Sequence, residues 1–394
     1  MLKVNKLPFI LLAILFITAL FVGGVFIYSL VTTLLSIIIL SYFSGRSVYK
    51  SIVNILWKNN DRVQVGEEVK LELEFYNSGI FPIPYLSVDT HFSKRMTGEE
   101  EREKIYSIMP ASKTFIKSEF VCKNKGIYQI GHADVEFGDA MGIFRWKKSF
   151  ENDVSLYVYP KVYNLKRLII PYRQNFGTVP VNHSAYEDFA SVRDIRKYAV
   201  GDSLKKVHWK VTAHKGEFYV KNLELNATAD LNVFWDLYHK SYVGELADEI
   251  EEIGAECAAS ILRYALNNHM AASLYAKDKN FVKLSGSGIG RFPEFLDQIT
   301  KSEVTGDTPV WELLKREAQK LSLGATAVII TPQIDETALE VLFSFKAKGI
   351  EFAIVYLCRN KELINPDVEA LKQRGITVNT ISLADDIRLA LGGS

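Results

Sequence analysis

The chain has 394 residues, of which 48% are hydrophobic and 24% are charged, and its 47 Lys and Arg residues balance 46 Asp and Glu residues. At roughly 100–200 residues per domain, this length predicts two or three domains. The balanced charge excludes a nucleic-acid-binding protein that is basic throughout, and the hydrophobic content excludes a chain kept disordered by charge.

The beginning of the chain has the composition of a membrane anchor. Residues 7–45 carry no charge, and Gly23-Gly24 divides them into Leu7–Val22 and Val25–Phe43. A spanning helix needs about 20 apolar residues, with a lower limit near 17. The second segment is long enough alone, whereas the first reaches that length only when the polar residues before it lie among the headgroups. We predict a two-helix transmembrane hairpin over residues 1–45.

Basic residues flank the hairpin on both sides, at Lys3, Lys6, Arg46, Lys50 and Lys58. Because positive flanks stay in the cytoplasm, we expect the rest of the chain there. A single span with an interfacial segment would instead place the bulk outside, and a cleaved secretory signal would have a much shorter core. Three widely spaced cysteines without a CxxC pair predict neither a disulfide framework nor a zinc site, in agreement with the cytoplasm.

Residues 46–170 have the pattern of an antiparallel β-sandwich-like domain. Apolar residues from Val69 to Phe75 alternate with charged ones, which is typical of a half-buried strand. Further strand candidates, separated by turns, are Tyr85–Asp89, Ile116–Val121, Gly126–Ile130, Ala133–Phe137 and Ser155–Tyr159. Short strands at this spacing predict a sandwich or an open barrel. We expect a structural or interaction role for this domain.

Residues 226–394 change to apolar strands that alternate with amphipathic helices. The first strand, Leu231–Trp235, ends in Asp236, and apolar residues then recur at helical spacing from Leu246 to Ala265. Later strand and helix candidates are Ala271–Ala276, Val310–Leu321, Ala325–Ile330, Glu336–Lys348, Phe352–Leu357, Pro366–Arg374 and Ile376–Ile381. This alternation predicts an α/β domain with a doubly wound, mainly parallel sheet. Asp236 falls at a strand end, where such sheets bind ligands.

Residues 171–225, between the two domains, contain a basic segment. From Arg193 to Lys221, eight Lys and Arg residues face three acids. The surplus is either a solvated helix face with acidic partners nearby or a surface for anionic lipid. Binding of nucleic acid by this segment would need steep salt dependence, and the balance of the whole chain argues against it.

The same segment predicts one helix, with Asp202 placed to cap it and Gly216 to end it. On that helix Trp209 lies opposite an apolar stripe that includes Val207 and Val211. Trp209 is therefore either sandwiched between two layers or an anchor for a partner or for the other domain, because Trp beside basic residues is typical of binding hot spots.

Asp202, His208 and His214 invite a metal-site or catalytic interpretation. The two histidines are six residues apart, on different faces of one helix, so the i, i+4 geometry of HExxH is absent. No nucleophile elbow or P-loop motif occurs. Gly286-x-Gly288-x-Gly290 does not fit GxGxxG, and we expect a turn there.

The segment from His183 to Glu224 resembles the bacterial family called domain of unknown function 58. That family combines an acid-Phe pair, Ser-x-Arg, Tyr, Gly-Asp, a basic pair, Asp-Trp, Ala-Arg and Val-Arg. The residues that carry the resemblance are Asp188, Phe189, Ser191, Arg193, Tyr198, Gly201, Asp202, Lys205, Lys206, His208, Trp209, Ala213, His214, Val220 and Lys221. His208 stands where the family has Asp, His214 stands for Arg, and Lys replaces several Arg, which weakens bidentate pairing at those positions.

The resemblance implies that the C-terminal domain is von Willebrand factor A-like. That fold often binds a divalent cation through Asp-x-Ser-x-Ser after the first strand, together with a later Thr and Asp. Here Tyr238 and Lys240 take the two Ser positions after Asp236, and Lys240 would bring a positive charge. Thr308 matches the middle Thr, whereas the later strand ends in Thr331 rather than Asp. Since hard cations need several oxygen ligands, we expect the fold without a metal or cofactor.

The resemblance also implies cooperation with MoxR-type AAA+ ATPases and other membrane-linked proteins in the assembly or maturation of complexes. We found no catalytic set, so we expect a membrane-anchored cytoplasmic scaffold or interaction protein rather than an enzyme. Its partners would be the lipid bilayer and other proteins, not nucleic acid. The alternative is a metal-dependent or hydrolytic enzyme that uses Asp202, His208 and His214, or Asp236.

Overall fold

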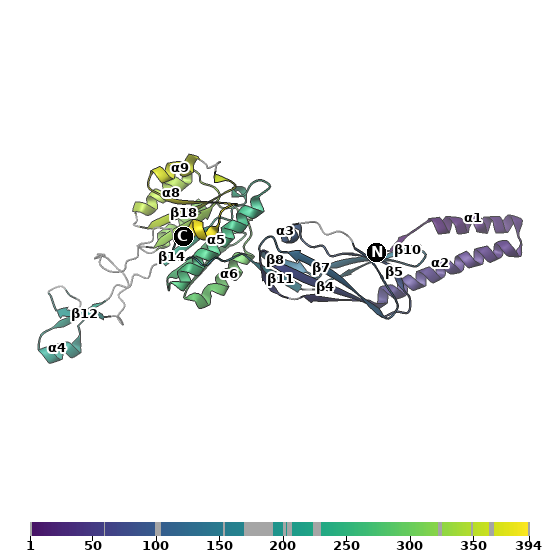
Figure 1. Cartoon of the computed structure of the whole chain (residues 1–394), viewed down its shortest axis with the longest axis horizontal. Coiled ribbons are helices and arrows are strands. Elements are labelled where there is room, and N and C mark those ends of the chain that lie inside the picture. The colour runs from purple at the N-terminus through teal and green to yellow at the C-terminus, as the bar shows by residue number, and fades with distance from the viewer. Residues whose placement is uncertain are drawn as a thin grey trace. The chain divides into compact units, whose positions relative to one another are not determined.

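The computed structural model describes residues 2–58, 60–98, 104–152, 154–168, 192–199, 202, 207–223, 230–321, 325–347, 350–361 and 366–392. The chain divides into two compact units, Met1–Lys161 and Val162–Ser394 (Figure 1). The predicted domain boundaries after residues 170 and 225 fall outside the described residues and stay predictions.

The first unit begins with two apolar helices, α1 (Leu7–Val22) and α2 (Val25–Ser51), which lie side by side (Figure 1). Gly23 and Gly24 both have positive φ angles, 67° and 100°, which glycine adopts without a steric penalty, so the chain reverses between the helices. Within the described part of the chain, α2 is the helix that is long and apolar enough to cross a membrane, and α1 is a shorter apolar helix. α2 continues past residue 45, where the sequence predicts the hairpin to end.

Both ends of this helix pair are attached to the same β-sheet. A short strand that the sequence does not predict, β1 (Leu2–Val4), precedes α1 and pairs antiparallel with β10 (Phe144–Phe150). At the end of α2, the ammonium group of Lys148 on β10 donates to the carbonyl oxygens of Tyr49 and Ile52, at 3.1 and 3.0 Å. This cation stabilises the negative end of the helix dipole.

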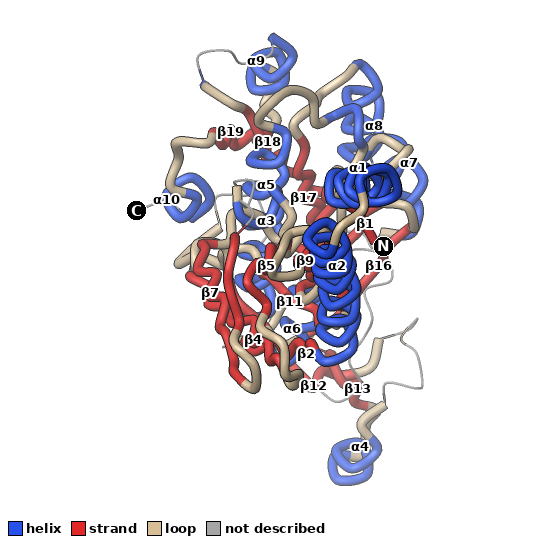
Figure 2. Tube along the Cα trace, turned by 90° about the vertical axis from the view of Figure 1, so that its right-hand side faces the viewer, coloured by secondary structure: helices blue, strands red, loops and turns tan. Residues whose placement is uncertain are grey.

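The remainder of the first unit is mainly β, as predicted, with one short helix. The prediction that it is antiparallel is wrong for one pair, because β3 runs parallel to β11. One sheet has the order β1-β10-β9-β5-β6, a second has β2-β4-β7, and a third has β3-β11-β8. The other elements are β2 (Ile52–Lys58), β3 (Arg62–Gln64), β4 (Glu68–Asn77), β5 (Ile83–Asp89), α3 (Lys94–Thr97), β6 (Lys104–Ile108), β7 (Ser112–Val121), β8 (Gly126–Ile130), β9 (Ala133–Gly138) and β11 (Val154–Tyr159). β4 and β7 run side by side in Figure 2. The alternation in β4 buries Val69, Leu71, Leu73 and Phe75, which confirms the predicted strand.

Gly45 allows α2 to lie close against the five-stranded sheet. A Cβ atom at position 45 would overlap the ring of Trp146, which is buried on β10. Trp146 in turn stacks on Phe137 of β9, with ring centroids 6.1 Å apart. The helix and the sheet therefore meet at a contact with no room for a side chain.

The second unit contains a six-stranded sheet with the order β16-β15-β14-β17-β18-β19. Its strands are β14 (Asp230–Trp235), β15 (Ala271–Lys277), β16 (Phe281–Ser287), β17 (Thr326–Thr331), β18 (Glu351–Cys358) and β19 (Thr377–Ser382). All neighbours are parallel except the edge strand β16, which is antiparallel to β15. When the six strands are numbered 1 to 6 in chain order, their order across the sheet is 3-2-1-4-5-6. This is a doubly wound topology, as predicted.

Helices cover both faces of this sheet. α5 (Ala247–Asn267), α6 (Phe292–Lys301) and α10 (Ile387–Gly392) share one hydrophobic core with the sheet. α7 (Val310–Glu317), α8 (Glu336–Ala347) and α9 (Pro366–Gln373) share the other. Because both faces are covered, successive residues of β14 are buried, which explains its continuous apolar run. Before the first strand of this sheet in the sequence, β12 (Val192–Lys197) pairs antiparallel with β13 (Tyr219–Leu223). α4 (Trp209–Lys215) lies between these two strands in sequence.

One local prediction for this unit is wrong in part. The run from Gly286 to Gly290 is not wholly a turn, because Gly286 lies in β16 and pairs with Ala272 of β15. Gly288, with a φ angle of 78°, leads into the short 3-10 helix Ile289–Arg291. An antiparallel edge strand rich in Gly and Ser has too weak a pattern to be recognised from its sequence.

We expect Gly45→Ala to destabilise the first unit by about 1–3 kcal/mol, the usual cost of forcing an extra methyl group into a packed contact. Thermal unfolding of the detergent-solubilised full chain, followed by circular dichroism, measures this. Gly290→Ala is the matched control, because a Cβ there meets no atom within 4 Å. Trp146→Leu in the same chain should reduce the effect of Gly45→Ala. Equal unfolding temperatures for the Gly45→Ala and Gly290→Ala chains would contradict the close contact.

Candidate functional site

Asp236 lies at the topological switch point of the six-stranded sheet. It follows β14 directly, and the neighbouring strand β17 ends at Thr331. The chain passes from β14 to β15 on one side, and it later crosses from β16 to β17 on the other side of β14. Doubly wound sheets bind ligands in the crevice where the strand order reverses in this way. Asp236 is therefore at the kind of strand end that the sequence analysis predicts.

The Asp236 carboxylate is 2% exposed and is surrounded by hydrogen-bond donors. The Thr331 hydroxyl donates to Oδ2 at 2.7 Å, and the Tyr238 backbone N–H donates to Oδ1 at 3.0 Å. The Ser241 hydroxyl and the backbone N–H of Val310, the first residue of α7, donate as well. Burial outweighs these hydrogen bonds and raises the pKa of Asp236 from 3.8 to about 6.

The residues around Asp236 do not fit a divalent cation. Tyr238 approaches Asp236 with its backbone amide, and the Lys240 side chain is exposed. Thr308 donates its hydroxyl to Asp307 at 2.9 Å. A hard cation needs several oxygen ligands, whereas donors of the protein already occupy the Asp236 oxygens. Among the described residues, no group of three or more His, Cys, Asp or Glu side chains is arranged to hold a metal.

A backbone contact closes the loop that follows Asp236. Tyr238 forms a parallel bridge with Gly306, whose N–H donates to the carbonyl oxygen of Leu237 at 2.9 Å. The Gly306 carbonyl oxygen accepts from the His239 N–H at 3.0 Å. A Cβ at position 306 would overlap the carbonyl oxygen of Lys277, so this contact requires glycine. The buried acid is thus part of a rigid polar network that fixes the edge of the sheet.

The family-like segment forms a separate small motif. β12 and β13 pair antiparallel, and α4 is inserted between them in sequence. The N-cap of α4 is His208, whose Nδ1 accepts a hydrogen bond of 3.3 Å from the Val211 N–H. The helix ends at Gly216, with a φ angle of 70°, as predicted.

The prediction that Asp202 caps this helix is wrong. The Arg196 guanidinium donates two hydrogen bonds of 2.7 Å to the Asp202 carboxylate, and the Ala199 N–H donates a third at 2.9 Å. Val207, predicted to be helical, instead forms a bridge with Val220 of β13, so the helix starts later. Asp202 fixes the end of β12 through a bidentate pair.

Trp209 is 65% exposed, so the interpretation that it is sandwiched between two layers is wrong. Its ring lies edge-on to Phe218, with centroids 6.4 Å apart, and Phe218 is itself 52% exposed. The Phe218 ring also contacts the Tyr198 ring, with centroids 6.1 Å apart. We call Tyr198, Trp209 and Phe218 the aromatic face. They are the residue after β12, the first residue of α4 and the residue before β13.

Several basic side chains belong to the same motif. Lys210 and Lys215 are exposed, and the Lys215 ammonium lies 5.1 Å from the centre of the Tyr219 ring. Lys197 forms an ion pair with Glu217, which raises the pKa of Lys197. An exposed aromatic cluster among basic side chains is suited to binding a protein surface.

The three groups of the catalytic alternative have separate roles in the structure. His208 uses Nδ1 to cap α4, Asp202 binds Arg196, and the His214 side chain is exposed in the last turn of α4. Lys221 is half-buried in β13, where it pairs with Ile195. Arg193 lies in β12. Six other residues of the motif lie outside the described residues: Asp188, Phe189, Ser191, Gly201, Lys205 and Lys206.

Sequence reasoning missed two residues of this motif, Phe218 and Arg196. Phe218 follows Gly216 by two residues, and an aromatic residue just after a helix-ending glycine is a signal for a returning strand. Arg196 lies between Ile195 and Lys197 in β12. Four of the six residues of this strand are charged, so the segment lacks the apolar alternation by which a strand is recognised. Its pairing with Asp202 depends on the turn between them, which no local pattern reveals.

Comparison with known proteins connects this motif to a family. The family model described as "Protein of unknown function DUF58" matches residues 194–373, from β12 to α9. A protein of Bacillus subtilis (strain 168), "Uncharacterized protein YeaD", is 22% identical over 341 residues, which cover 84% of this chain and 83% of that protein. The predicted resemblance to the domain of unknown function 58 family is thereby confirmed over the matched segment.

Solved structures give weaker similarities. The CARDB domain of a Pyrococcus furiosus protein is 13% identical, with a TM-score of 0.19, and covers 27% of this chain and 91% of that chain. The sporulation control protein Spo0M of Bacillus subtilis is 15% identical, with a TM-score of 0.17, over 27% of this chain and 49% of that chain. Such scores support no argument about fold or function.

We expect the stability of the second unit to depend on pH through Asp236. Its pKa is higher in the folded state, so the folded chain binds more protons between about pH 4 and 6. The stabilisation is complete below the unfolded value of 3.8 and is lost as the pH rises through about 6. At 1.36 kcal/mol per pKa unit, this amounts to about 3 kcal/mol.

The measurement is denaturant unfolding of the full chain, followed by tryptophan fluorescence, to which the buried Trp235 and Trp311 of the second unit contribute. Relative to Asp236→Asn, the unaltered chain should gain stability between pH 7.5 and pH 4.5. Glu303→Gln, which removes an exposed carboxylate, is the control. A constant difference between the unaltered chain and Asp236→Asn over this range would rule out the titration.

Proposed function

We propose that this protein is a membrane-anchored interaction protein of the domain of unknown function 58 family. The observation that carries the proposal is the aromatic face, which lies on the segment that the family model matches and exposes Trp209 and Phe218. Large exposed aromatic side chains are costly in water unless a partner covers them. The protein would help to assemble or mature a complex, with no reaction of its own.

The membrane anchor in this proposal is the helix pair α1 and α2, inserted as a hairpin. Support comes from the attachment of both ends of the pair to one sheet, the start through the pairing of β1 with β10 and the end of α2 through Lys148. Exposed apolar side chains along both helices, such as Phe21 and Val25, are stable in lipid. The basic flanks would hold the soluble units in the cytoplasm.

The second unit would serve as a von Willebrand factor A-like binding platform without a cation. The 3-2-1-4-5-6 strand order with an antiparallel edge strand supports this assignment. Protein donors saturate the one buried acid at the switch point, so the unit would bind partners through its surface. A site already filled by its own hydrogen bonds favours this role over metal-dependent or hydrolytic chemistry.

The partner class that we propose is a MoxR-type AAA+ ATPase, as the family resemblance implies. Trp209 and Phe218 would insert into an apolar pocket of that partner, while Lys210 and Lys215 face acidic groups at the rim. Buried aromatic anchors of this kind commonly dominate the free energy of binding, and rim charges mainly affect the rate of association.

We expect Trp209→Ala to weaken capture of the partner strongly, and Phe218→Ala to do so by a similar mechanism. Loss of a hot-spot aromatic side chain costs about 2 kcal/mol or more, which is more than tenfold in affinity. The experiment compares proteins cross-linked to the full chain in intact cells, identified by mass spectrometry after gentle detergent extraction. Val243→Ala, an 80% exposed apolar residue in the second unit, is the matched control.

A MoxR-type ATPase recovered with the unaltered chain and with Val243→Ala, but depleted with Trp209→Ala, supports the proposal. Equal recovery with all three chains would remove the aromatic face as the binding surface. Turnover of a substrate by the purified chain would contradict the scaffold role itself.

A further inference from the structure

The two ends of the β-domain differ in charge. Three connections lie at the end where α2 leads into β2. Those over residues 78–82 and 109–111 are uncharged, and the one over residues 139–143 has a single charged residue, Asp139, which is buried. At the other end of the same strands, the connections over residues 90–103 and 122–125 are rich in Lys, Arg and Glu. The end beside the helix pair is therefore the apolar end of the domain.

The tip of each of these three connections exposes one large apolar side chain. Ile80 is 80% exposed, Met109 is 67% exposed and Met141 is 63% exposed. The first two tips are held together by Asn77, whose side-chain amide donates to the carbonyl oxygens of Phe81 and Met109 at 2.8 and 3.3 Å. Three such side chains at one end of a domain form a surface that water solvates poorly.

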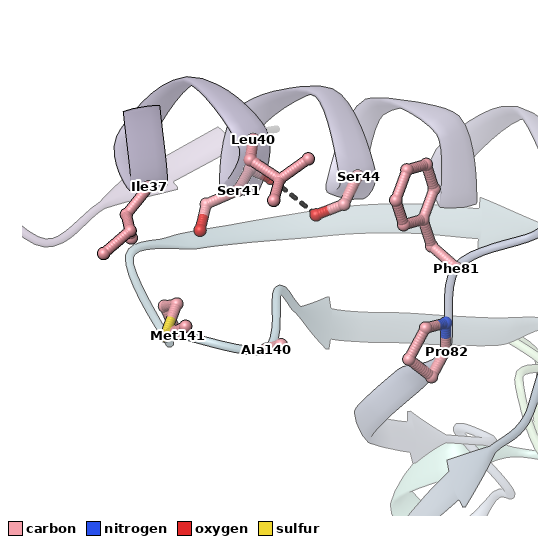
Figure 3. Close-up of a pocket in the computed structure, with 8 residues that line it drawn as sticks. All are labelled: Ile37, Leu40, Ser41, Ser44, Phe81, Pro82, Ala140 and Met141. Carbon is pink, nitrogen blue, oxygen red and sulfur yellow. Dashed lines mark hydrogen bonds between the residues drawn. The ribbon is translucent and has the colours of Figure 1, made fainter. Parts of the chain in front are cut away.

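The tips share a cavity with α2. It has a volume of about 120 Å³, and its lining includes Leu40 and Ser44 of α2, Phe81 of the first tip and Met141 of the third (Figure 3). The Ser44 hydroxyl donates to the carbonyl oxygen of Ser41 at 2.9 Å, so this polar group is satisfied within the helix. The lining beside the candidate membrane helix is therefore mainly apolar, with the Ser41 hydroxyl as a further polar group (Figure 3).

The length of α2 sets the depth of this cavity in a bilayer. At about 1.5 Å per residue, Leu40 lies about 22 Å and Ser44 about 28 Å along the axis from Val25. The hydrocarbon core is about 30 Å thick, so both residues would still lie within it when Val25 is at the far boundary. The first charge on α2 comes later, at Arg46. Phe81 and Met141 line the same cavity as Leu40 and Ser44, so they would lie at a similar depth in the bilayer.

We propose that the tips carrying Ile80 and Met141 are immersed in the bilayer, and that phospholipid acyl chains cover them and the cavity beside α2. This inference rests on the membrane anchor of the proposed function and extends it to the β-domain. Immersion removes the exposed side chains of Ile80 and Met141 from water, and it fixes the domain against the membrane surface at a second place besides the helices.

The test uses the full chain reconstituted in phosphatidylethanolamine–phosphatidylglycerol vesicles, with one nitroxide spin label in each variant. The labelled positions are Ile80→Cys and Met141→Cys at the tips, Leu35→Cys in the middle of α2, and Lys123→Cys at the charged end. The native cysteines are buried, and the unaltered chain treated with the label measures their background. Collision rates with oxygen, which enters lipid, and with a water-soluble nickel chelate report the depth of each label.

We expect labels at positions 80 and 141 to collide with oxygen and to lose collisions with the nickel chelate, as the label at position 35 does. The label at position 123 should collide with the chelate. Chelate collisions at 80 and 141 equal to those at 123 would overturn the inference while leaving the anchor intact. Chelate access at position 35 would instead remove the anchor. Loss of both kinds of collision at 80 and 141 would show a protein, such as a second copy, covering the tips.

Discussion

The pairing of β1 with β10 is the constraint on which the first unit depends. Without it, the end of α2 would still be attached to the sheet through Gly45 and Lys148, whereas the start of α1 would lose the strand that holds it there. With it, the chain must leave the sheet at Val4, reverse at two glycines and return to the sheet through Gly45 and Trp146. In lipid, helices are favoured because their backbone groups are satisfied within the segment. The β-domain therefore fixes both ends of an element whose exposed surface is suited to lipid.

The second unit has the architecture of a ligand-binding sheet, but groups of the protein itself form hydrogen bonds with the acid at its switch point. Thr331 and the start of α7 direct donors at Asp236, and Gly306 closes the loop that follows it. A buried acid held in this way stabilises one arrangement of the sheet edge. The exposed features suited to binding are instead on the β12–α4–β13 motif. This separation of a rigid platform from an exposed aromatic surface agrees with a role in binding proteins.

Sequence patterns predicted the elements whose burial is strongest. β14 and β17 are covered on both faces and α5 has a long apolar stripe, so each could be recognised from its own residues. β1 could not, because three residues form a strand only when β10 is beside them. Asp202 satisfied the local rule for a helix cap, but Arg196 binds it more directly. The exposure of Trp209 was uncertain for the same reason, since the face it occupies depends on where the helix begins.

At the candidate site as well, local patterns predicted the position of the acid but not its distant partners. The place of Asp236 at a strand end could be predicted, because a doubly wound sheet brings its ligand-binding residues to that edge. Its hydrogen-bond partner Thr331 lies 95 residues further along the chain, and which atoms approach the acid depends on packing between distant loops. Tyr238 and Lys240, in place of two Ser residues after Asp236, indicate locally that the oxygen ligands of a cation site are missing.

The central claim is that a hairpin anchors the chain and that both soluble units lie in the cytoplasm. Cysteine accessibility in spheroplasts tests it most directly, with Val25→Cys at the turn between the helices and Val243→Cys in the second unit; the two valines are 88% and 80% exposed. A membrane-impermeant maleimide should label position 25 from outside and should label position 243 only after lysis. Labelling of position 243 in intact spheroplasts would contradict the account.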